Sequence, residues 1–399
     1  MSSCADAPQT RCAECSSPDE SCDATCICAT AASGWAWFES VGKPEYWLAP
    51  MVGQSETAFR MLCRTRGKGM MCSTEMVDAA GYARSEKYRA QFPFFPEDQP
   101  LVFQIGGSNP KDLAEAARLA APHCSAVELN VGCPQRCAKK GGYGAFLMDT
   151  PEQLASCVEA MAAAIHAANP RCACLVKIRC FEDTGATLRL ARMLVRAGCQ
   201  CLTVHGRTRH QGGGARTGKW LANWDWIRNV QEAVRVPVVA NGNIRYHSDL
   251  AECLAATAGC VGVMSGCGAL KRPFLFAAPS KPGEDEKGDL ARLQAALEYL
   301  PLAGRYPTHP RAVAKHLTAM VPSRAVRGST VGKAFLARVH ALACSTRGQC
   351  SEDELQGLFA AAQPVFEEAQ GRLACAGQAC EDESDEDEGG ASQQGGASR

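Results

Sequence analysis

Short apolar runs alternate with amphipathic stretches between residues 47 and 264, and this alternation constrains the fold more than any other feature. Each run has the length of a buried strand, and each stretch between two runs has a spacing typical of a helix. The expected strands are Trp47–Met51, Met70–Val77, Leu101–Ile105, Ala126–Val131, Cys174–Ile178, Cys201–Val204, Val236–Ala240 and Cys260–Met264. Strands and helices in this order predict an α/β protein, a (β/α)8 TIM barrel, with a doubly wound open sheet as the alternative.

The stretches between the expected strands carry helix start signals. Pro110 and Pro151 occupy first-turn positions behind Asn109 and Thr150, and both of these residue types cap helix amino termini well. We therefore expect both side chains to act as caps. The expected helices are Pro110–Ala121, Pro151–Ala168, Thr187–Ala197, Trp224–Val234 and Ser248–Thr257.

The sequence changes character after Phe276, where Pro282, Gly283 and a charged cluster indicate a linker. Only helical patterns follow, and the expected helices are Leu290–Leu300, Pro310–Met320, Val331–Leu342 and Glu352–Gln370. The predicted organisation is a disordered Cys-rich extension over 1–40, a catalytic barrel over 41–280, a small helical domain over 290–370 and a disordered acidic tail over 371–399.

The formal net charge of zero hides an uneven distribution of charge along the chain. Residues 301–350 contain no Asp or Glu, whereas residues 381–388 are almost entirely acidic. A basic segment of this kind favours a surface for nucleic-acid phosphates, with a solvated helix face as the alternative. The cations of the segment are Arg305, Arg311, Lys315, Arg324, Arg327, Lys333, Arg338 and Arg347.

The chain has 24 cysteines, and several lie within apolar runs, where Cys behaves as a small hydrophobic residue. A secreted disulfide scaffold is short and rich in loops, so we expect a reducing compartment, the cytoplasm or the nucleus. Cys12 and Cys15, with Cys22, Cys26 and Cys28, could ligate zinc, but the spacing matches no familiar zinc pattern and we predict no metal site. The sequence contains no expected membrane span or secretory signal.

Polar side chains follow the expected strands where each one ends. In a barrel these carboxyl ends surround the active site, so the side chains should converge at one mouth. The converging residues are Gln104, Asn130, Lys177, Arg179, His205 and Asn241. Cys133 follows the fourth expected strand and would present its thiol at the same place, with an ordinary buried cysteine as the alternative.

The turns after the last two expected strands are rich in glycine. Asn241–Asn243 and Gly266–Gly268 can bring backbone N–H groups close to a phosphate, which is the usual phosphate site of this fold. Lys177 can stabilise negative charge on a reduced flavin ring, and Gln104 offers both a donor and an acceptor to a ring edge. Together these residues favour flavin mononucleotide (FMN) as cofactor.

The sequence resembles the tRNA-dihydrouridine synthases over residues 47–277 and, more loosely, to about residue 345. The stretch Lys139–Leu147 is most similar to the eukaryotic branch that reduces uridines 16 and 17 of the tRNA D-loop. The motifs that carry the resemblance are Ala49–Val52, Glu128–Gln135, Ala138–Met148, Val176–Arg179, His205–Thr208 and Ala240–Ile244.

The resemblance implies an FMN-dependent oxidoreductase that takes its electrons from NADPH or NADH and acts on tRNA. Cys133 would be the proton donor, while Asn130 and Arg179 would orient the target uracil. Lys177 and His205 would contact the flavin. The remaining residues implied to bind the cofactor are Pro50, Met51, Val52 and Gln104 at the isoalloxazine ring, and Asn241, Gly242, Asn243, Gly266 and Cys267 at the ribityl phosphate.

Two alternatives remain open at this point. A flavin barrel similar to the dihydroorotate dehydrogenases would reduce or oxidise a free pyrimidine, although such a small substrate needs no basic helical domain. A non-catalytic RNA-binding barrel is the second alternative, although it would have no need for Cys133, Lys177 and His205. We expect tRNA as the partner, and neither a membrane nor an obligatory protein partner.

Overall fold

The structure, a computed structural model, describes residues 27–211, 221–277, 289–321, 329–344 and 348–382. These residues form two compact units. The first extends to Ala269 and takes in a short piece beginning at Leu275, and the second comprises Leu270–Phe274 and the described residues from 289 onward. Within the described residues, no helix is both long and apolar enough to cross a membrane.

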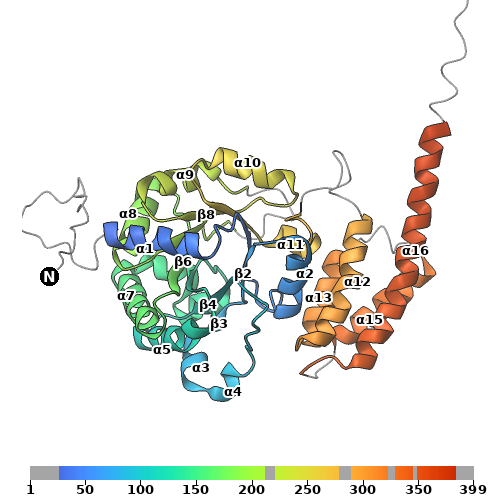
Figure 1. Cartoon of the computed structure of the whole chain (residues 1–399), viewed down its shortest axis with the longest axis horizontal. Helices are drawn as coiled ribbons and strands as arrows, with labels where there is room; N and C mark the ends of the chain where they lie inside the picture. The colour runs from blue at the N-terminus through green and yellow to red at the C-terminus, as the bar shows by residue number, and fades with distance from the viewer. Residues whose placement is uncertain (1–26, 212–220, 278–288, 322–328, 345–347, 383–399) are drawn as a thin grey trace, which may run out of the picture. The chain divides into compact units, whose positions relative to one another are not determined.

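The first unit is a closed barrel of parallel strands (Figure 1). Strand β1 pairs with both β2 and β9, and β2 also pairs with β4, so the sheet closes on itself. This closure confirms the predicted TIM barrel and excludes the open sheet. The strands are β1 (Tyr46–Leu48), β2 (Met71–Ser73), β3 (Val77–Asp78), β4 (Leu101–Gly106), β5 (Ala126–Val131), β6 (Ala173–Arg179), β7 (Cys201–His205), β8 (Val238–Asn241) and β9 (Gly262–Ser265). The expected strand Met70–Val77 is divided into β2 and the short β3.

Helices surround the strands (Figure 1). They are α2 (Thr57–Arg66), α3 (Ala79–Arg84), α4 (Glu86–Arg89), α5 (Pro110–Ala120), α6 (Arg136–Gly141), α7 (Pro151–Ala168), α8 (Thr184–Arg196), α9 (Trp224–Ala233), α10 (Ser248–Ala256) and α11 (Cys267–Lys271), with 3-10 turns η1 (Ala121–His123) and η2 (Gly144–Asp149). The five predicted helices of this unit are therefore confirmed as α5, α7, α8, α9 and α10.

The two predicted caps have different outcomes. The Asn109 side chain accepts hydrogen bonds from the backbone N–H groups of Lys111 and Asp112, at 2.9 and 3.3 Å, and so caps α5 as expected. The prediction for Thr150 is wrong, because its hydroxyl instead donates to the carbonyl of Leu147, in η2, at 3.3 Å. The preceding 3-10 turn supplies an acceptor that competes with the capping role.

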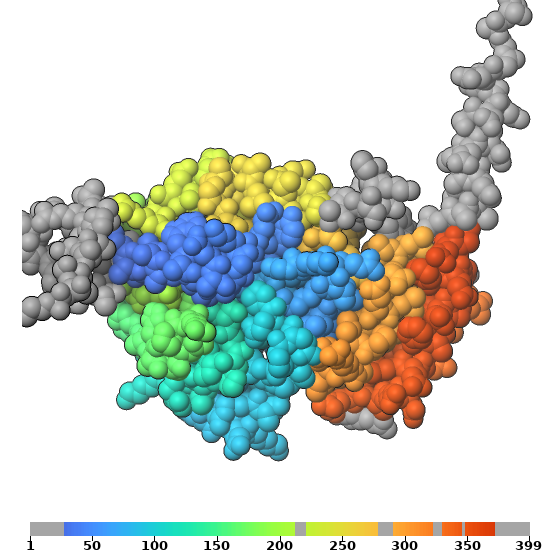
Figure 2. Space-filling view, in the orientation of Figure 1, coloured from blue at the N-terminus to red at the C-terminus, as the bar shows by residue number. Residues whose placement is uncertain are grey.

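Residues 27–40 correct the prediction of a disordered extension over 1–40. Ile27–Ser40 form helix α1, which appears in blue on the surface of the barrel unit (Figure 2). The Trp37 indole N–H donates to the carbonyl of Ser125 at 2.8 Å, and the Gln200 amide donates to the Ser33 hydroxyl at 3.0 Å. Ser125 and Gln200 immediately precede β5 and β7, so α1 lies at the amino end of the barrel.

The core of the barrel explains why α1 is ordered. Trp37 and Phe38 are each 5% exposed, and they pack into a cluster whose other members come mainly from the strands. These members are Trp47, Ala49, Met71, Val102, Ala126, Ala173, Leu175, Cys201, Val239 and Met264. The helix therefore buries two large aromatic side chains and covers the apolar interior of the barrel. Of the cysteines considered above as zinc ligands, Cys28 belongs to α1, and the others lie within residues 1–26, outside the described residues.

The second unit is helical within its described residues. Its helices are α12 (Asp289–Arg305), α13 (Pro310–Met320), α15 (Thr330–Ala343) and α16 (Glu352–Asp382). The four helical segments predicted here are confirmed, but α16 continues past residue 371, so the predicted start of the disordered tail is wrong. Residues 383–399 lie outside the described residues.

The basic segment of this unit is partly described. Arg324, Arg327 and Arg347 lie outside the described residues. The other five cations are all exposed: Arg305, Arg311, Lys315, Lys333 and Arg338. Arg311 and Lys315 are four residues apart in α13 and therefore share one face of that helix.

Candidate active site at the carboxyl end of the barrel

The strand register brings the predicted polar residues to the carboxyl end of the barrel. Lys177 in β6 lies opposite Asn130 in β5. One strand further along, Arg179 lies opposite His205, and His205 in turn lies opposite Asn241. Because successive residues of a strand point to opposite faces, residues two apart such as Lys177 and Arg179 share the inner face.

A buried carboxylate, Glu128, lies beneath these residues. It is fully buried and accepts hydrogen bonds from the Gln104 amide at 2.6 Å and from the Thr203 hydroxyl at 3.2 Å. Burial raises the pKa of Glu128, while Lys177 and the two hydrogen bonds act in the opposite direction. No individual role for Glu128 was predicted from the sequence, although an acidic residue within an apolar run is a visible signal.

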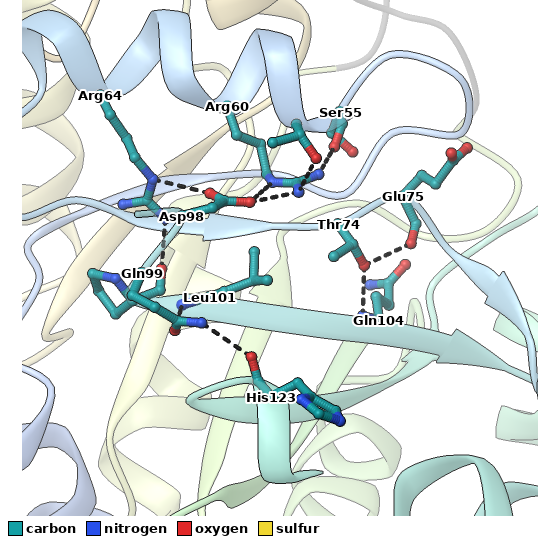
Figure 3. Close-up of polar contacts among 12 residues, drawn as sticks. Ser55, Arg60, Arg64, Thr74, Glu75, Asp98, Gln99, Leu101, Gln104 and His123 are labelled. Carbon is teal, nitrogen blue, oxygen red and sulfur yellow. Dashed lines mark hydrogen bonds and ion pairs between the residues drawn. The ribbon is translucent and has the colours of Figure 1, made fainter. Parts of the chain in front are cut away.

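Gln104 connects this carboxylate to Asn130. Its Nε2 donates to Glu128, and its Oε1 accepts a hydrogen bond from Asn130 Nδ2 at 2.8 Å. Gln104 is itself fully buried, and its backbone N–H donates to the Thr74 hydroxyl at 3.0 Å (Figure 3). Both polar atoms of the Gln104 side chain are therefore engaged by protein groups.

Asn130 holds the loop that carries Cys133. Its Oδ1 accepts hydrogen bonds from the backbone N–H groups of Gly132 and Cys133, at 3.1 and 3.0 Å. On the other side of the loop, Gly144 has a φ of +64°, and a Cβ at this position would lie 2.7 Å from the carbonyl oxygen of Cys133. The Cys133 backbone is thus fixed from two sides.

The Cys133 thiol is half-buried at the end of this loop. Burial is the largest cause of a raised pKa for this thiol, which the nearby Cys137 also raises and the Gln135 backbone and Arg179 lower. Since the ordinary value is already 9.0, Cys133 is a neutral thiol at neutral pH. A neutral thiol can donate a proton, whereas a thiolate would act as a nucleophile.

Lys177 places a cation next to the loop. Its ammonium donates to Asn241 Oδ1 at 2.9 Å, and the Asn241 amide donates to the carbonyl of Met264 at 2.8 Å. Burial lowers the pKa of Lys177 to about 8, with Arg179 acting in the same direction and Glu128 opposing it. Lys177 is therefore mainly protonated at neutral pH, but by a small margin.

His205 is held in a defined state by Arg207. The Arg207 guanidinium lies 2.8 Å from His205 Nε2. A guanidinium can only donate, so Nε2 accepts and the neutral ring carries its proton on Nδ1. Burial, followed by the cations Lys177, Arg179 and Arg207, lowers the pKa of His205 well below 6.5, so the ring is neutral at neutral pH.

Arg207 also connects His205 to the turn after β8. It donates to Asn243 Oδ1 at 2.8 Å, and the Asn243 side chain also bonds both the N–H and the carbonyl of Ala222, at 2.9 and 3.0 Å. Gly242 and Asn243 both have left-handed backbones, with φ of +122° and +68°. The predicted phosphate turn is therefore a tightly fixed loop.

Arg179 is engaged by backbone carbonyls. Its side chain donates to Gly132 at 2.7 Å and to Thr208 at 2.9 Å. Burial lowers its pKa to about 10, followed by the effect of Arg207, so the guanidinium stays charged at neutral pH. Arg179 thereby ties the Cys133 loop to the loop after β7.

The loop after β1 carries Pro50, Met51 and Val52. The Met51 backbone N–H bonds the Ser55 hydroxyl at 2.9 Å, while the Val52 side chain is 61% exposed. A buried ion pair supports the loop: Arg60 donates to the Ser55 carbonyl and to the Asp98 carboxylate, as Figure 3 shows.

Gly266 and Cys267 follow β9. A Cβ at position 266 would lie 3.3 Å from Ala49 Cβ and 3.4 Å from Met51 Sδ, so Gly266 allows the loops after β9 and β1 to approach closely. Cys267 is exposed and begins α11. The structure thus places every predicted site residue within the last three residues of a strand or in the segment that follows it.

Two groups in this region have spare hydrogen-bonding capacity toward a polar ligand. Lys177 carries three N–H donors, of which one bonds Asn241. The buried Ser73 hydroxyl at the end of β2 has no hydrogen-bond partner among the residues that the structure describes. A planar ring with carbonyl and nitrogen acceptors along one edge fits such donors. No group of three His, Cys, Asp or Glu residues among the described parts of the chain could hold a metal ion.

Comparisons with known proteins point to one family. The model of the family described as dihydrouridine synthase (Dus) matches residues 47–336. A Rattus norvegicus protein named as tRNA-dihydrouridine(16/17) synthase-like is 40% identical over 286 residues, which cover 70% of this chain and 60% of that protein. Proteins named as tRNA-dihydrouridine(16/17) synthase from Schizosaccharomyces pombe and Saccharomyces cerevisiae are 37% and 39% identical. These two matches cover 62% and 61% of this chain, and 61% and 57% of the relatives, so the chain spans about three fifths of the relatives it matches.

Proposed function

The chain belongs to the dihydrouridine synthase family, and from this premise we propose that it reduces uridines 16 and 17 of the tRNA D-loop to dihydrouridine. The position of Cys133 is the observation that carries the proposal: a neutral thiol on a doubly fixed loop, in a barrel mouth that also holds the Lys177 cation. The names of the three relatives support positions 16 and 17, and the match to a Mus musculus protein named for positions 20a and 20b is shorter, at 36% identity over 233 residues.

We propose FMN as the cofactor and NADPH or NADH as the source of electrons. Lys177, His205 and Gln104 would surround the ring, with Pro50, Met51 and Val52 on the loop after β1. Asn241, Gly242, Asn243, Gly266 and Cys267 would hold the ribityl phosphate. Among the observations in favour are the unused donors of Lys177 and the positive φ angles of Gly242 and Asn243, because turns with left-handed residues can form concave sites that bind anions through backbone N–H groups.

The chemistry divides between the cofactor and the protein. A bound, reduced flavin supplies the hydride that adds to C6 of the uracil ring. The target base must leave its stack to reach the barrel mouth. Cys133 then transfers its thiol proton to C5, so that a hydride and a proton together saturate the C5–C6 bond. Lys177 stabilises the negative charge that develops, and Asn130 and Arg179 hold the Cys133 loop next to the base.

We propose that the basic segment of the helical unit binds tRNA phosphates. Arg311 and Lys315 lie on one face of α13, and both are exposed. Phosphate contacts of this type give affinity that falls with salt. An enzyme of this type would act in the cytoplasm or the nucleus, where thiols stay reduced.

The decisive experiment uses purified full-length protein. We expect flavin absorbance, and dihydrouridine at positions 16 and 17 when unmodified tRNA is incubated with NADPH. Free uracil and orotate should not be reduced. A yellow protein that reduces a free pyrimidine but not tRNA would refute the tRNA proposal, and a colourless, inactive protein would leave the non-catalytic barrel as the better account.

A second experiment tests the tRNA-binding surface. We expect Arg311→Ala/Lys315→Ala to weaken tRNA binding and to reduce the slope of log affinity against log salt by about 1 for each lost phosphate contact. Arg192→Ala/Arg196→Ala is the matched control, because these two exposed arginines are also four residues apart, on the barrel helix α8. Equal effects of the two double variants would refute the proposed surface.

A further inference from the structure

The proposed chemistry leaves Glu128 without a role, although burying this carboxylate is costly. It lies in the barrel interior with no exposed surface, and burial raises its pKa. A buried acid that served no purpose could be replaced by an apolar residue at no cost, since removing an unneeded buried charge is often neutral or stabilising. The contacts of Glu128 indicate what the carboxylate does.

The first step concerns the orientation of Gln104. An amide side chain has a donor end and an acceptor end, and its two orientations have similar shapes. Both oxygens of the Glu128 side chain accept hydrogen bonds, one from Gln104 at 2.6 Å and one from Thr203 at 3.2 Å. An ionised carboxylate has no donor, so it selects the orientation in which Gln104 Nε2 points toward it. Gln104 Oε1 is thereby directed toward the carboxyl end of the barrel.

The second step concerns Asn130, whose side chain is also an amide. Because Gln104 presents an oxygen, Asn130 must present its Nδ2, and the two atoms lie 2.8 Å apart. Asn130 Oδ1 is consequently turned toward the loop, where it accepts from the N–H groups of Gly132 and Cys133. In the opposite orientation the Asn130 amide nitrogen would face those two donors, and both hydrogen bonds would be lost.

We propose that Glu128 is a positioning residue that sets, through Gln104 and Asn130, the conformation of the loop that carries Cys133. We call these three side chains the relay. At one end the Glu128 carboxylate accepts hydrogen bonds, and at the other end the backbone N–H groups of the loop donate them, so all hydrogen bonds of the relay have a fixed direction. The relay itself stands on hydrogen bonds within the barrel. Its consequence for catalysis rests on the proposed function, because only there is Cys133 the proton donor.

The polarity of the relay suggests a test by reversal. In Asn130→Asp, the carboxylate introduced at position 130 can still accept from the loop, but it faces Gln104 Oε1, and the wild-type Glu128 prevents Gln104 from turning. Adding Glu128→Gln supplies an amide donor at position 128. Gln104 can then rotate, donate to position 130 and accept from position 128. Thr203 can hydrogen-bond the side chain at position 128 in either orientation of the new amide, because a hydroxyl can both donate and accept.

The measurement is the rate at which iodoacetamide alkylates Cys133 in the full-length protein as purified, followed by peptide mass spectrometry. We expect alkylation in Asn130→Asp to be about fivefold faster than in the wild type, because the hydrogen bond that holds residue 130 to Gln104 is lost, and a hydrogen bond of ordinary net strength corresponds to a change of about this size. Glu128→Gln alone should match the wild type, since its amide oxygen still accepts from Gln104. The double variant Glu128→Gln/Asn130→Asp should return to within about twofold of the wild type.

Two other thiols serve as internal controls. Cys344 is exposed and lies in the helical unit, so its alkylation rate should be the same in all four proteins. Cys199 is fully buried and should stay unmodified while the barrel is folded. If Asn130→Asp alone unfolds the barrel, Cys199 becomes reactive, and recovery of its protection in the double variant supports the relay equally well.

The comparison between the double variant and Asn130→Asp decides the question. A double variant that is no better than the single one overturns the relay, and so does an Asn130→Asp protein that behaves like the wild type. Dihydrouridine formation in tRNA is measured in parallel and should follow the same order. If the wild type forms no dihydrouridine but the alkylation pattern appears as expected, the proposed function fails and the relay stands.

Discussion

The two ends of the barrel use opposite kinds of side chain. At the carboxyl end, charged and amide groups such as Lys177, Arg179 and Asn130 are held by hydrogen bonds. At the amino end, α1 covers the interior with Trp37 and Phe38, and the cluster behind them is apolar. Each buried cation at the carboxyl end costs desolvation energy, whereas each aromatic side chain at the amino end contributes burial energy. Burial of aromatic side chains at the amino end can therefore offset the desolvation of the cations buried at the carboxyl end.

The largest effect that this comparison predicts is on activity alone. We expect Cys133→Ala to lower the rate of dihydrouridine formation by about 10²–10⁴-fold, the usual range for loss of a general acid, with an unchanged melting temperature. The assay is single-turnover reduction of tRNA, with thermal unfolding in parallel. Cys137→Ala, four residues along the chain and exposed, is the matched control. A normal rate in Cys133→Ala would show that another group donates the proton.

The next effect is on stability alone. Trp37→Ala should lower the free energy of unfolding by about 3–5 kcal/mol, as for other large aromatic residues in cores. Chemical denaturation monitored by circular dichroism measures this loss. At temperatures well below unfolding the rate per folded molecule should be unchanged. Trp35→Ala is the control, because the Trp35 side chain is 42% exposed and should cost much less. If Trp37→Ala abolished activity in folded protein, the division between the two ends would be wrong.

A smaller effect is expected in the pH dependence of the reaction rate, which should reflect a group at the carboxyl end of the barrel and none at the amino end. Lys177, with a pKa of about 8, is charged below that pH and neutral above it, so the rate should fall as pH rises through about 8, by about tenfold per pH unit well above it. Lys177→Arg should shift this decline to higher pH. At the apolar end, burial raises the pKa of Cys174 to about 12, so that group does not titrate over the same range. The pH-rate profiles of the wild type and of Lys177→Arg are compared. If both rates decline over the same alkaline range, deprotonation of Lys177 is not the cause of the decline.

The smallest expected effect is on the free energy of unfolding, at the amino termini of helices α5 and α7. Asn109→Ala should lower the free energy of unfolding by about 1 kcal/mol, because it removes a helix cap. Thr150→Ala should have nearly no effect, because Thr150 makes no capping bond. Equilibrium denaturation of both variants checks the pair. Equal losses would mean that the Thr150 hydroxyl contributes in a way its bond to Leu147 does not explain.

Much of the barrel could be predicted because its signals are local. The run Ala126–Val131 coincides with β5, and Pro151–Ala168 coincides with α7. Helix α1 was missed for a physical reason. Its sequence mixes Ala, Ser, Gly and Trp without a clear apolar stripe, and its order comes from long-range contacts of Trp37 and Phe38 with the barrel. The aromatic residues between Trp35 and Phe38 were the signal that could have identified it.

The candidate site shows a similar limit. Its members could be predicted because each one follows an apolar run, as Asn130 and Lys177 do. Their connections could not, because a hydrogen bond such as Gln104 to Glu128 depends on strand register and on which way an amide is turned. The role of Glu128 therefore became visible only when both of its partners were in place.

The position of α1 has a consequence for how the chain is made. Helix α1 is synthesised before any strand of the barrel, yet its Trp35, Trp37 and Ser33 bond Arg235, Ser125 and Gln200, which lie 88 to 200 residues further along the chain. During translation, α1 therefore has no binding site until most strands of the barrel have been synthesised. Contacts of such long sequence separation form late and slowly. The cluster around Trp37 also includes Met264 of β9, so the full binding site of α1 is available only after the last strand has been translated. A protease that cuts between α1 and β1 in nascent chains would show when α1 docks.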